Sequence, residues 1–355
     1  MSSALLSSYQ LGDLQLRNRM VMAPMTRNRA GEGEVPTEMN AIYYRQRATA
    51  GLIITEASQV SPEGIGYPAT PGIHSNDQVS GWQKITRAVH EEGGRIFIQL
   101  WFCGRISHPS LLPGNATPVA PSAIRPAGQA FTPDGMQDFV TPKALSVGEI
   151  DDIVEQYRQA SHVASEAGFD GIEVHAANGY LIDQFLRDGS NQRDDAYGGS
   201  AENRMRLLNR VLDAVLEVWP SQRVGVRLTP ENSFNDMSDS DPAGHFLYFI
   251  QQLNARNLAY LHILEGNMGG GDRALDYRVL RDAFNGSYIA NNGYTRQSGE
   301  QALDNGDADL IAYGMPFLAN PDLVERFRVG AELNPPNIDL LYGGGAEGYT
   351  DYPTL

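Results

Sequence analysis

Three polar side chains that could act together on one substrate, His175, Asn178 and Tyr180, lie close to one another in the sequence. They follow residues 168–174, a short apolar run that predicts a buried strand, and the Ala-Ala-Asn-Gly sequence after the histidine predicts a turn. An imidazole and an amide can donate hydrogen bonds to an oxygen that gains charge, and a phenol can supply a proton. A lone histidine at a strand end is more often structural, so this segment alone leaves both interpretations open.

Eight apolar runs predict the strands that would position these side chains. They are residues 20–25, 52–57, 96–101, 171–175, 224–229, 259–264, 288–291 and 310–314. Helical patterns between them lie at residues 39–50, 82–92, 149–167, 201–218, 243–255, 277–283, 298–305 and 321–329. The clearest, 149–167, has apolar residues at helical spacing and a capping box formed by Ser146 and Glu149. The alternation predicts an α/β fold, a single (β/α)8 TIM barrel with capping loop insertions.

The chain has 355 residues, without a linker or a change of composition, so we expect one domain over residues 1–355. The length beyond the roughly 250 residues of a typical barrel lies mainly in residues 58–76 and 102–142, which should lie at the catalytic mouth. The glycine clusters at residues 269–271 and 343–345 lack the Gly-x-Gly-x-x-Gly spacing of a dinucleotide-binding helix. A nicotinamide cofactor would therefore visit the mouth as a substrate.

Composition excludes several classes of function. The net charge of -16 disfavours nucleic acid and anionic membranes as partners. The single cysteine, Cys103, excludes an internal disulfide and a cysteine-ligated iron–sulfur or zinc cluster within one chain, so redox chemistry needs an organic cofactor. The histidines show no metal-ligand spacing, so no metal is expected and a metal hydrolase is disfavoured. Without a signal-peptide pattern or a long apolar run, the chain is expected to be soluble and cytoplasmic.

Further polar and small residues mark the ends of other predicted strands. They are Pro24, Met25 and Thr26 after the first strand, Ala57 after the second, Gln99 and Trp101 on the third, and Arg227 on the fifth. The Gln99 amide can donate and accept hydrogen bonds, as a pyrimidine edge requires, and Arg227 can hold negative charge at one end of such a ring. An arginine on an apolar strand is costly without an anionic partner. This set suits a flavin ring.

A phosphate group is usually held after strands 7 and 8 of such barrels by backbone N–H groups and helix N-termini. The sequence places Asn292 and Gly293 after the seventh strand, and Gly314 and Met315 after the eighth. These positions suit the phosphate of a flavin mononucleotide.

From Leu11 to the final residue, the chain resembles the old yellow enzyme family of FMN-dependent NADPH:enone reductases, of the N-ethylmaleimide reductase type. Six segments, in order along the chain, carry this resemblance. They are residues 18–27, 51–57, 99–101 with 104–108, 175–180, 193–204 and 343–349. The resemblance implies an NAD(P)H-dependent flavin oxidoreductase with non-covalently bound FMN and with NADPH or NADH as hydride donor. The flavin N5 would pass hydride to the β-carbon of an activated alkene, such as an enone or a maleimide, or reduce a nitro or nitrate-ester compound.

The resemblance also implies a role for each candidate residue. Thr26 would bind near the flavin C4 carbonyl, Gln99 at the pyrimidine edge, and Arg227 near N1 and the C2 carbonyl. His175 and Asn178 would bind the substrate oxygen, and Tyr180 would protonate the α-carbon. The complete cofactor set is Pro24, Met25, Thr26, Ala57, Gln99, His175, Arg227, Asn292, Gly293, Gly314 and Met315. The substrate pocket is expected to be lined by Tyr67, Trp101, His175, Asn178, Tyr180, Asn235 and Tyr342.

The chain departs from the family pattern at three places. Met315 replaces an arginine that helps to hold the FMN phosphate, and the loss of a charged donor could weaken FMN retention by about tenfold to a hundredfold. Phe102 replaces a histidine, with little expected effect on the chemistry. Asn178 stands where some relatives have histidine, which keeps a neutral donor.

Two alternatives to an ene reductase fit these features less well. A relative of the dienoyl-CoA reductases would need an iron–sulfur region, which a single cysteine cannot supply. A flavin-binding barrel with little or no catalysis is favoured by Met315 and opposed by the intact set of His175, Asn178 and Tyr180.

Overall fold

The protein is described by a computed structural model that covers residues 3–268 and 273–355. Eight parallel strands close into a barrel in the order β10-β11-β12-β13-β14-β3-β4-β5, which confirms the predicted (β/α)8 fold. The strands are β3 (Met20–Met22), β4 (Leu52–Gln59), β5 (Ile96–Trp101), β10 (Gly171–His175), β11 (Val224–Leu228), β12 (Tyr260–Leu264), β13 (Ser287–Asn291) and β14 (Leu310–Tyr313). All eight match predicted runs: β5 and β10 have the predicted bounds, and the other six differ from their runs at one end. The glycine cluster at 269–271 lies outside the described residues.

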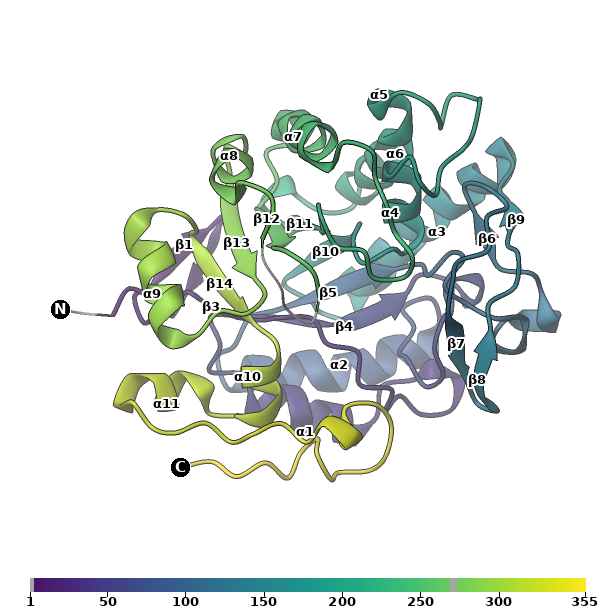
Figure 1. Cartoon of the computed structure of the whole chain (residues 1–355). Coiled ribbons are helices and arrows are strands. Elements are labelled where there is room, and N and C mark those ends of the chain that lie inside the picture. Colours follow the sequence, from purple (N-terminus) through teal and green to yellow (C-terminus); the bar gives the residue numbers. More distant parts are fainter. Residues whose placement is uncertain (1–2, 269–272) are drawn as a thin grey trace.

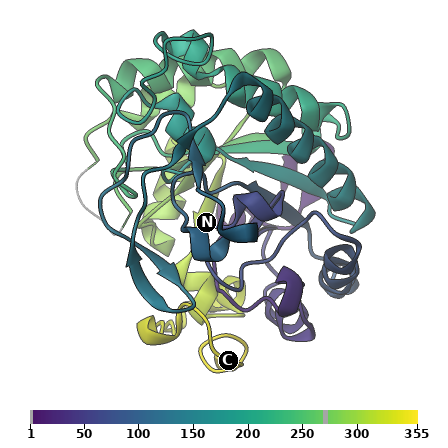
Figure 2. The same ribbon diagram turned by 90° about the vertical axis from the view of Figure 1, so that its right-hand side faces the viewer.

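Helices surround the barrel in both ribbon views (Figures 1 and 2). They are α1 (Glu38–Gln46), α2 (Asn76–Glu91), α3 (Val147–Glu166), α4 (Leu181–Leu186), α5 (Ala201–Arg204), α6 (Arg206–Leu216), α7 (Pro242–Leu253), α8 (Tyr277–Asp282), α9 (Arg296–Asn305), α10 (Met315–Ala319) and α11 (Leu323–Val329). The capping box predicted for α3 is present, since Ser146 and Glu149 exchange hydrogen bonds. Each predicted helix has a counterpart, although the boundaries differ.

Two helix predictions were wrong in detail. The helix predicted at 201–218 is divided into α5 and α6 at Met205. Helix α2 begins at Asn76, earlier than the predicted start, because Ser75 and Gln78 form a capping box there.

The barrel interior is filled by side chains that alternate along the strands. Val21, Ile54 and Ile289 share one buried cluster with leucines of a short hairpin, β1 (Tyr9–Leu11) and β2 (Leu14–Leu16). The neighbouring residues of the same strands belong to a second cluster, which also includes the apolar faces of the helices. Since successive residues of a strand point to opposite faces, one set fills the barrel and the other holds the helices.

The two long insertions lie over one end of the barrel, as predicted. Residues 102–142 include β6 (Val119–Ala120) and a hairpin, β7 (Gln129–Thr132) with β8 (Gly135–Asp138), while β9 (Lys143–Ala144) pairs with β6 just beyond it. Ala130 of the hairpin belongs to a buried cluster with Trp101 and Tyr180. The insertion therefore packs directly on Tyr180, one of the predicted catalytic residues.

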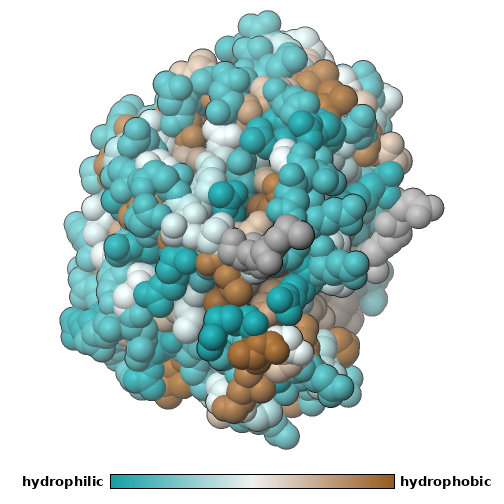
Figure 3. Space-filling model, turned by 90° about the vertical axis from the view of Figure 1, so that its left-hand side faces the viewer, coloured by the Kyte–Doolittle hydropathy of each residue, from teal (hydrophilic) through white to brown (hydrophobic). Residues whose placement is uncertain are grey.

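The face in Figure 3 is mostly hydrophilic, with hydrophobic side chains in small separate groups. Among the described residues, no helix combines the length and the apolar character that crossing a membrane would require.

Candidate active site

The predicted catalytic residues follow β10 and meet at the carboxyl end of the barrel. His175 is the last residue of β10, and Tyr180 immediately precedes α4. Between them, Asn178 (φ 56) and Gly179 (φ 76) are both left-handed, which Asn tolerates and glycine adopts freely. A Cβ at Gly179 would lie 2.8 Å from the Cβ of Asn235. The Asn-Gly turn thus bends the chain tightly beneath the loop after β11.

His175 is a neutral hydrogen-bond donor. Its ring is buried, and the backbone N–H of Ala177 donates to its Nδ1 at 3.3 Å. Nδ1 is therefore the acceptor, which assigns the proton to Nε2. Burial lowers the pKa of His175 well below its usual value, and the charge of Arg227 lowers it further. The imidazole stays neutral at physiological pH and can donate through Nε2–H.

Asn178 is held so that its amide group can act as a donor. The Asn232 Nδ2 group donates to the Asn178 Oδ1 atom at 3.2 Å, which turns the Nδ2 end of Asn178 the other way. The Asn178 backbone is fixed as well, because its N–H donates to Thr229 Oγ1 at 2.8 Å and its carbonyl accepts from Asn235 Nδ2 at 2.8 Å. Asn232 could not be identified from the sequence, because it lies far from Asn178 in the chain and has no motif around it.

Tyr180 lies within an aromatic group. Its hydroxyl is 3.1 Å from the Tyr67 hydroxyl, and its ring packs edge-on against Trp101 and His175, with centroids 4.8 and 5.2 Å away. Burial raises the pKa of Tyr180 well above its usual value, and Tyr67 raises it further. Tyr180 therefore keeps its proton at neutral pH, as a proton donor must.

The other predicted pocket residues lie at different depths. Asn235 is close enough to Tyr67 and Tyr180 for its amide to lower the pKa of each phenol. Tyr342 lies farther out, with 61% of its surface exposed. The structure therefore brings Tyr67 and Asn235 into the central group and places Tyr342 at the rim.

Two flavin-contact candidates lie inside the barrel next to this group. Arg227 on β11 pairs in register with His175 on β10. Its Nη2 donates to Asn291 Oδ1 at 2.9 Å, whereas its buried Nε has no hydrogen-bond partner within residues 3–268 and 273–355. Gln99 on β5 is also buried and donates from Nε2 to Glu173 at 2.6 Å. Glu173 was not among the candidates, although a carboxylate in an apolar strand requires a partner.

The predicted phosphate residues follow the adjacent strands β13 and β14. Asn292 has a left-handed φ of 92°, and its Nδ2 donates to the carbonyl of Glu265 at 2.7 Å. Gly314 precedes Met315, the first residue of α10. A Cβ at Gly314 would lie 3.0 Å from the Sδ atom of Met25. Residues predicted to bind the flavin after the first and eighth strands are therefore neighbours.

Arg27 and Arg29 attach residues 340–349 to the loop after β3, and we call this arrangement the arginine clamp. Arg27 is fully buried and donates to the Gly348 carbonyl at 2.7 Å across 321 positions of sequence. Both guanidinium groups lie over the ring of Tyr349, at 5.0 and 4.7 Å from its centroid. The clamp holds the segment that carries the pocket-rim tyrosine close to the loop of Thr26.

Glu56 connects the same loop to β4. It is buried immediately before Ala57 and accepts hydrogen bonds from the Arg27 backbone N–H at 3.1 Å and the Tyr44 hydroxyl at 3.3 Å. Burial raises the pKa of Glu56 to about 7, despite the opposing effect of these bonds. The carboxyl group therefore titrates close to neutral pH.

A Glu56→Gln variant should respond differently to pH. The pKa of Glu56 in the folded state, about 7, lies above the ordinary value of 4.5, so between these values the folded state binds more protons than the unfolded state. The original protein should then lose stability as pH rises through this interval. As pH rises through this interval, the unfolding free energy of the original protein should fall by up to about 3 kcal/mol relative to that of the variant. Urea unfolding of both proteins at about pH 5 and pH 8 measures this, and a constant difference would contradict it.

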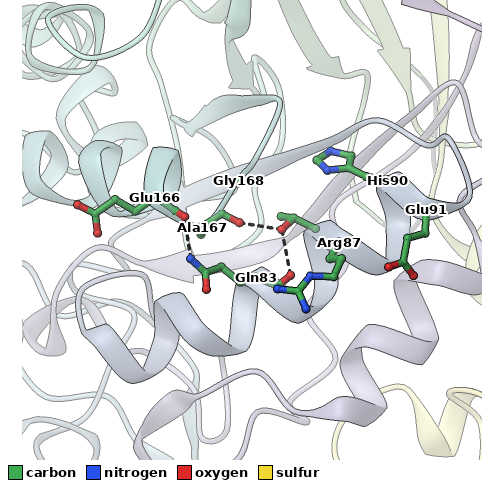
Figure 4. A pocket seen from close by; sticks show the side chains of 8 residues that line it. Gln83, Arg87, His90, Glu91, Glu166, Ala167 and Gly168 are labelled. Carbon is green, nitrogen blue, oxygen red and sulfur yellow. Dashed lines mark hydrogen bonds between the residues drawn. The ribbon is translucent and has the colours of Figure 1, made fainter.

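A groove on the outside of the barrel is separate from this site (Figure 4). It is lined by Gln83, Thr86, Arg87, His90, Glu91, Glu166, Ala167 and Gly168. Gln83 Nε2 donates to the Glu166 carbonyl at 3.0 Å, and Thr86 Oγ1 donates to the Ala167 carbonyl at 2.7 Å. These bonds join α2 to the end of α3, and none of the predicted site residues lines the groove.

Comparisons with known proteins agree with this geometry. Residues 5–334 match the model of the NADH:flavin oxidoreductase / NADH oxidase family. The chain is 43% identical over 360 residues to 12-oxophytodienoate reductase 1 of Oryza sativa subsp. japonica, covering 99% of this chain and 93% of that protein. It is 43% identical over 350 residues to a probable flavin mononucleotide-dependent alkene reductase of Leishmania infantum, covering 97% and 96%. The structure of the old yellow enzyme homologue from Zymomonas mobilis superposes with a TM-score of 0.96, at 42% identity, covering 99% and 100% of the two chains.

Proposed function

Because the chain belongs to the old yellow enzyme family of NADH:flavin oxidoreductases, we propose that His175, Asn178 and Tyr180 are its catalytic residues. The protein is an FMN-dependent alkene reductase that uses a nicotinamide as hydride donor. One observation carries the residue assignment. The neighbouring groups occupy His175 Nδ1 and Asn178 Oδ1, which leaves the Nε2–H of His175 and the Nδ2 of Asn178 as donors, and the hydroxyl of Tyr180 lies in the same group, 3.1 Å from that of Tyr67.

The residues of the barrel fit an FMN molecule. Arg227 is a buried cation with an unpartnered Nε in the described part of the chain, and such a group is costly unless an anionic or hydrogen-bonding ligand meets it. Gln99 donates from Nε2 to Glu173, which leaves its Oε1 as an acceptor for the N–H of a pyrimidine edge. Pro24, Met25, Thr26 and Ala57 would contact the flavin ring. Asn292, Gly293, Gly314 and Met315 would hold the phosphate with backbone N–H groups.

The proposed mechanism assigns one task to each side chain. A bound FMN would supply the hydride chemistry, as acceptor from the nicotinamide and donor to the β-carbon of the alkene. His175 and Asn178 bind the carbonyl oxygen of the substrate through neutral donors and stabilise the negative charge that develops there. Tyr180 gives its phenolic proton to the α-carbon. Trp101 and Tyr67, whose rings stack with centroids 5.7 Å apart, form an aromatic wall for a flat substrate.

The substrate class follows from the same donors. An electron-poor alkene needs a neighbouring oxygen that can accept hydrogen bonds, so enones and maleimides are the expected substrates, and nitro or nitrate-ester groups offer equivalent oxygens. Small activated alkenes agree with the relatives' names. We also propose that residues 1–355 form a single FMN-binding domain and that the protein acts in the cytoplasm.

An absorption experiment tests the proposed function. The purified protein is incubated with FMN, desalted, and treated under anaerobic conditions with NADPH and then with 2-cyclohexenone. A retained flavin band that bleaches with NADPH and returns with the enone supports both half-reactions. A band that bleaches but does not return would favour the alternative of a flavin-binding barrel. Repeating the test with excess FMN in solution separates weak cofactor retention from loss of chemistry.

Met315→Arg should strengthen FMN binding. Position 315 starts α10 beside Gly314, and a guanidinium group there would add a charged donor for the phosphate. The dissociation constant of FMN should fall by about tenfold to a hundredfold. Quenching of flavin fluorescence on titration of the apoprotein measures it. Met315→Leu is the matched control and should leave FMN affinity unchanged, and equal affinities for the Arg and Leu variants would contradict the prediction.

A further inference from the structure

A buried acid lies in the barrel beside the residues proposed to contact the flavin. Glu173 occupies the middle of β10, and its side chain is fully buried. It accepts hydrogen bonds from Gln99 Nε2 at 2.6 Å and from His262 Nδ1 at 2.8 Å. Gly225, which pairs with Glu173 on the neighbouring strand, leaves room for the Tyr260 ring, from which a Cβ there would lie 2.2 Å. A buried carboxylate with two hydrogen bonds is a built feature of the barrel and is not explained by packing alone.

Glu173 is ionised and His262 is neutral. Burial would raise the pKa of Glu173, but the hydrogen bonds from His262 and Gln99 and the charge of Arg227 oppose burial, and the pKa is lowered. Burial lowers the pKa of His262, so this imidazole donates to the carboxylate through Nδ1–H without a charge of its own. The cluster therefore places one negative charge beside the cation of Arg227.

The bond to Glu173 fixes the orientation of the Gln99 amide. An ionised carboxylate only accepts hydrogen bonds, so the Gln99 Nε2 must face Glu173 and the Oε1 atom must face away. The backbone of Gln99 is held too, since its N–H donates to Thr55 Oγ1 at 3.2 Å. A flavin pyrimidine has an N–H group between two carbonyls, and a fixed amide oxygen is the acceptor that this N–H requires. A reversed amide would place the Nε2–H group of Gln99 against the pyrimidine N–H, and two donors cannot form a hydrogen bond.

Glu173 also acts on the charge of Arg227. Burial lowers the pKa of Arg227, and Glu173 is the largest influence that raises it. Arg227 has one hydrogen-bonded side-chain partner among the described residues, the neutral Asn291. The negative charge that offsets this arginine therefore comes from Glu173 on the neighbouring strand β10.

We propose that Glu173 is a positioning residue for the cofactor, which orients the Gln99 amide and offsets the Arg227 charge, and so sets both the FMN affinity and the midpoint potential of the flavin. The inference rests on the proposed function, because Gln99 and Arg227 touch the cofactor only if FMN binds within the barrel.

Glu173→Gln tests both parts at once, because it removes the charge and keeps the shape. The new carboxamide can donate to Gln99, so the Gln99 amide can reverse, and the dissociation constant of FMN is expected to rise about tenfold. The charge of Arg227 is then no longer offset, so reduced flavin, which carries negative charge, is favoured over oxidised flavin about tenfold more than in the original protein. This change corresponds to a rise of about 30 mV in the midpoint potential of a two-electron couple. Fluorescence titration of the apoprotein measures the affinity, and a spectroelectrochemical titration measures the potential.

Two further variants separate charge from packing. Glu173→Asp keeps the charge but shortens the reach to Gln99, so FMN affinity should fall about tenfold while the potential stays near the original value. His262→Asn keeps a neutral donor towards Glu173 and should change neither quantity by more than about threefold. If Glu173→Gln does not fold, the loss of affinity in Glu173→Asp still tests the orientation of Gln99.

The outcomes that overturn the inference are distinct from failure of the proposed function. Unchanged affinity and potential in Glu173→Gln would overturn it, as would unchanged affinity in Glu173→Asp. A shift of potential in His262→Asn as large as in Glu173→Gln would show that disturbance of the cluster, and not the charge, is responsible. If the unaltered protein does not bind FMN, the proposed function fails and this inference fails with it.

Discussion

Replacement of Tyr180 by phenylalanine is expected to slow the reduction of 2-cyclohexenone by the FMN-loaded protein by roughly 100-fold to 10,000-fold. The substitution removes only the hydroxyl, which lies 3.1 Å from that of Tyr67, and keeps the ring that packs against Trp101. The pKa of Tyr180 is raised by burial, so the phenol carries the proton that the α-carbon needs. Stopped-flow mixing of the reduced protein with the enone isolates this half-reaction.

Two comparisons make the result specific. Reduction of the FMN-loaded Tyr180→Phe protein by NADPH should keep its original rate, because no proton is given to a carbon in that half-reaction. Tyr67→Phe removes the hydroxyl next to Tyr180 and leaves the proposed donor in place, so its effect on enone reduction should be much smaller. A Tyr180→Phe protein that retained the full rate would show that Tyr180 is not the proton donor.

Asn178→Asp is expected to lower kcat/KM for 2-cyclohexenone by at least about 100-fold. Aspartate has the same shape and tolerates the left-handed φ of 56°, and it can still accept from Asn232. It replaces the Nδ2 donor by a carboxylate oxygen. The substrate oxygen then loses a hydrogen-bond donor and faces a negative charge while it gains negative charge itself. Steady-state kinetics with saturating FMN measure the effect.

Asn232→Asp is the matched partner of that variant. It cannot donate to Asn178 Oδ1, yet it keeps the oxygen that accepts from the backbone of Phe234 at 3.2 Å. A carboxylate only accepts hydrogen bonds, so the Asn178 amide can reverse and turn its Nδ2 towards position 232, while the donor itself is retained. We expect a loss of about tenfold, smaller than that of Asn178→Asp because the amide can still turn back to the substrate oxygen. A loss as large as that of Asn178→Asp would mean that the Asn232 side chain has a direct role.

The barrel could be predicted because its strands are buried on both faces. All eight residues of β4, for example, are buried, and such strands give nearly continuous apolar runs that are visible in the sequence. The hairpins β1–β2 and β7–β8 and the short helices α4 and α10 were not predicted. These elements have few residues and owe their stability to packing against the barrel, which leaves little local signal.

Some residues of the candidate site could likewise be predicted from the sequence, and others could not. His175, Asn178 and Tyr180 could be found because they share one turn, and Trp101 and Gln99 because they end an apolar strand. Asn232, Glu173 and Glu56 could not be assigned, because their partners lie elsewhere in the chain and only the fold brings them together. Glu173 did carry a signal, since an acid within an apolar strand demands a partner, but the sequence does not name that partner.

The arginine clamp has a consequence for the order in which the protein is made. Arg27 leaves the ribosome 321 residues before Gly348, whose carbonyl it binds, and β3 must likewise wait for β14, its neighbour in the closed barrel. At a synthesis rate of about 5–20 residues per second, this interval is on the order of 15–60 seconds. During most of that time neither β14 nor residues 340–349, which the arginine clamp holds close to the loop of Thr26, have been made. The cofactor site can therefore close only as one of the last events of synthesis, and the nascent chain has a long period in which chaperones can engage its unpaired first strands.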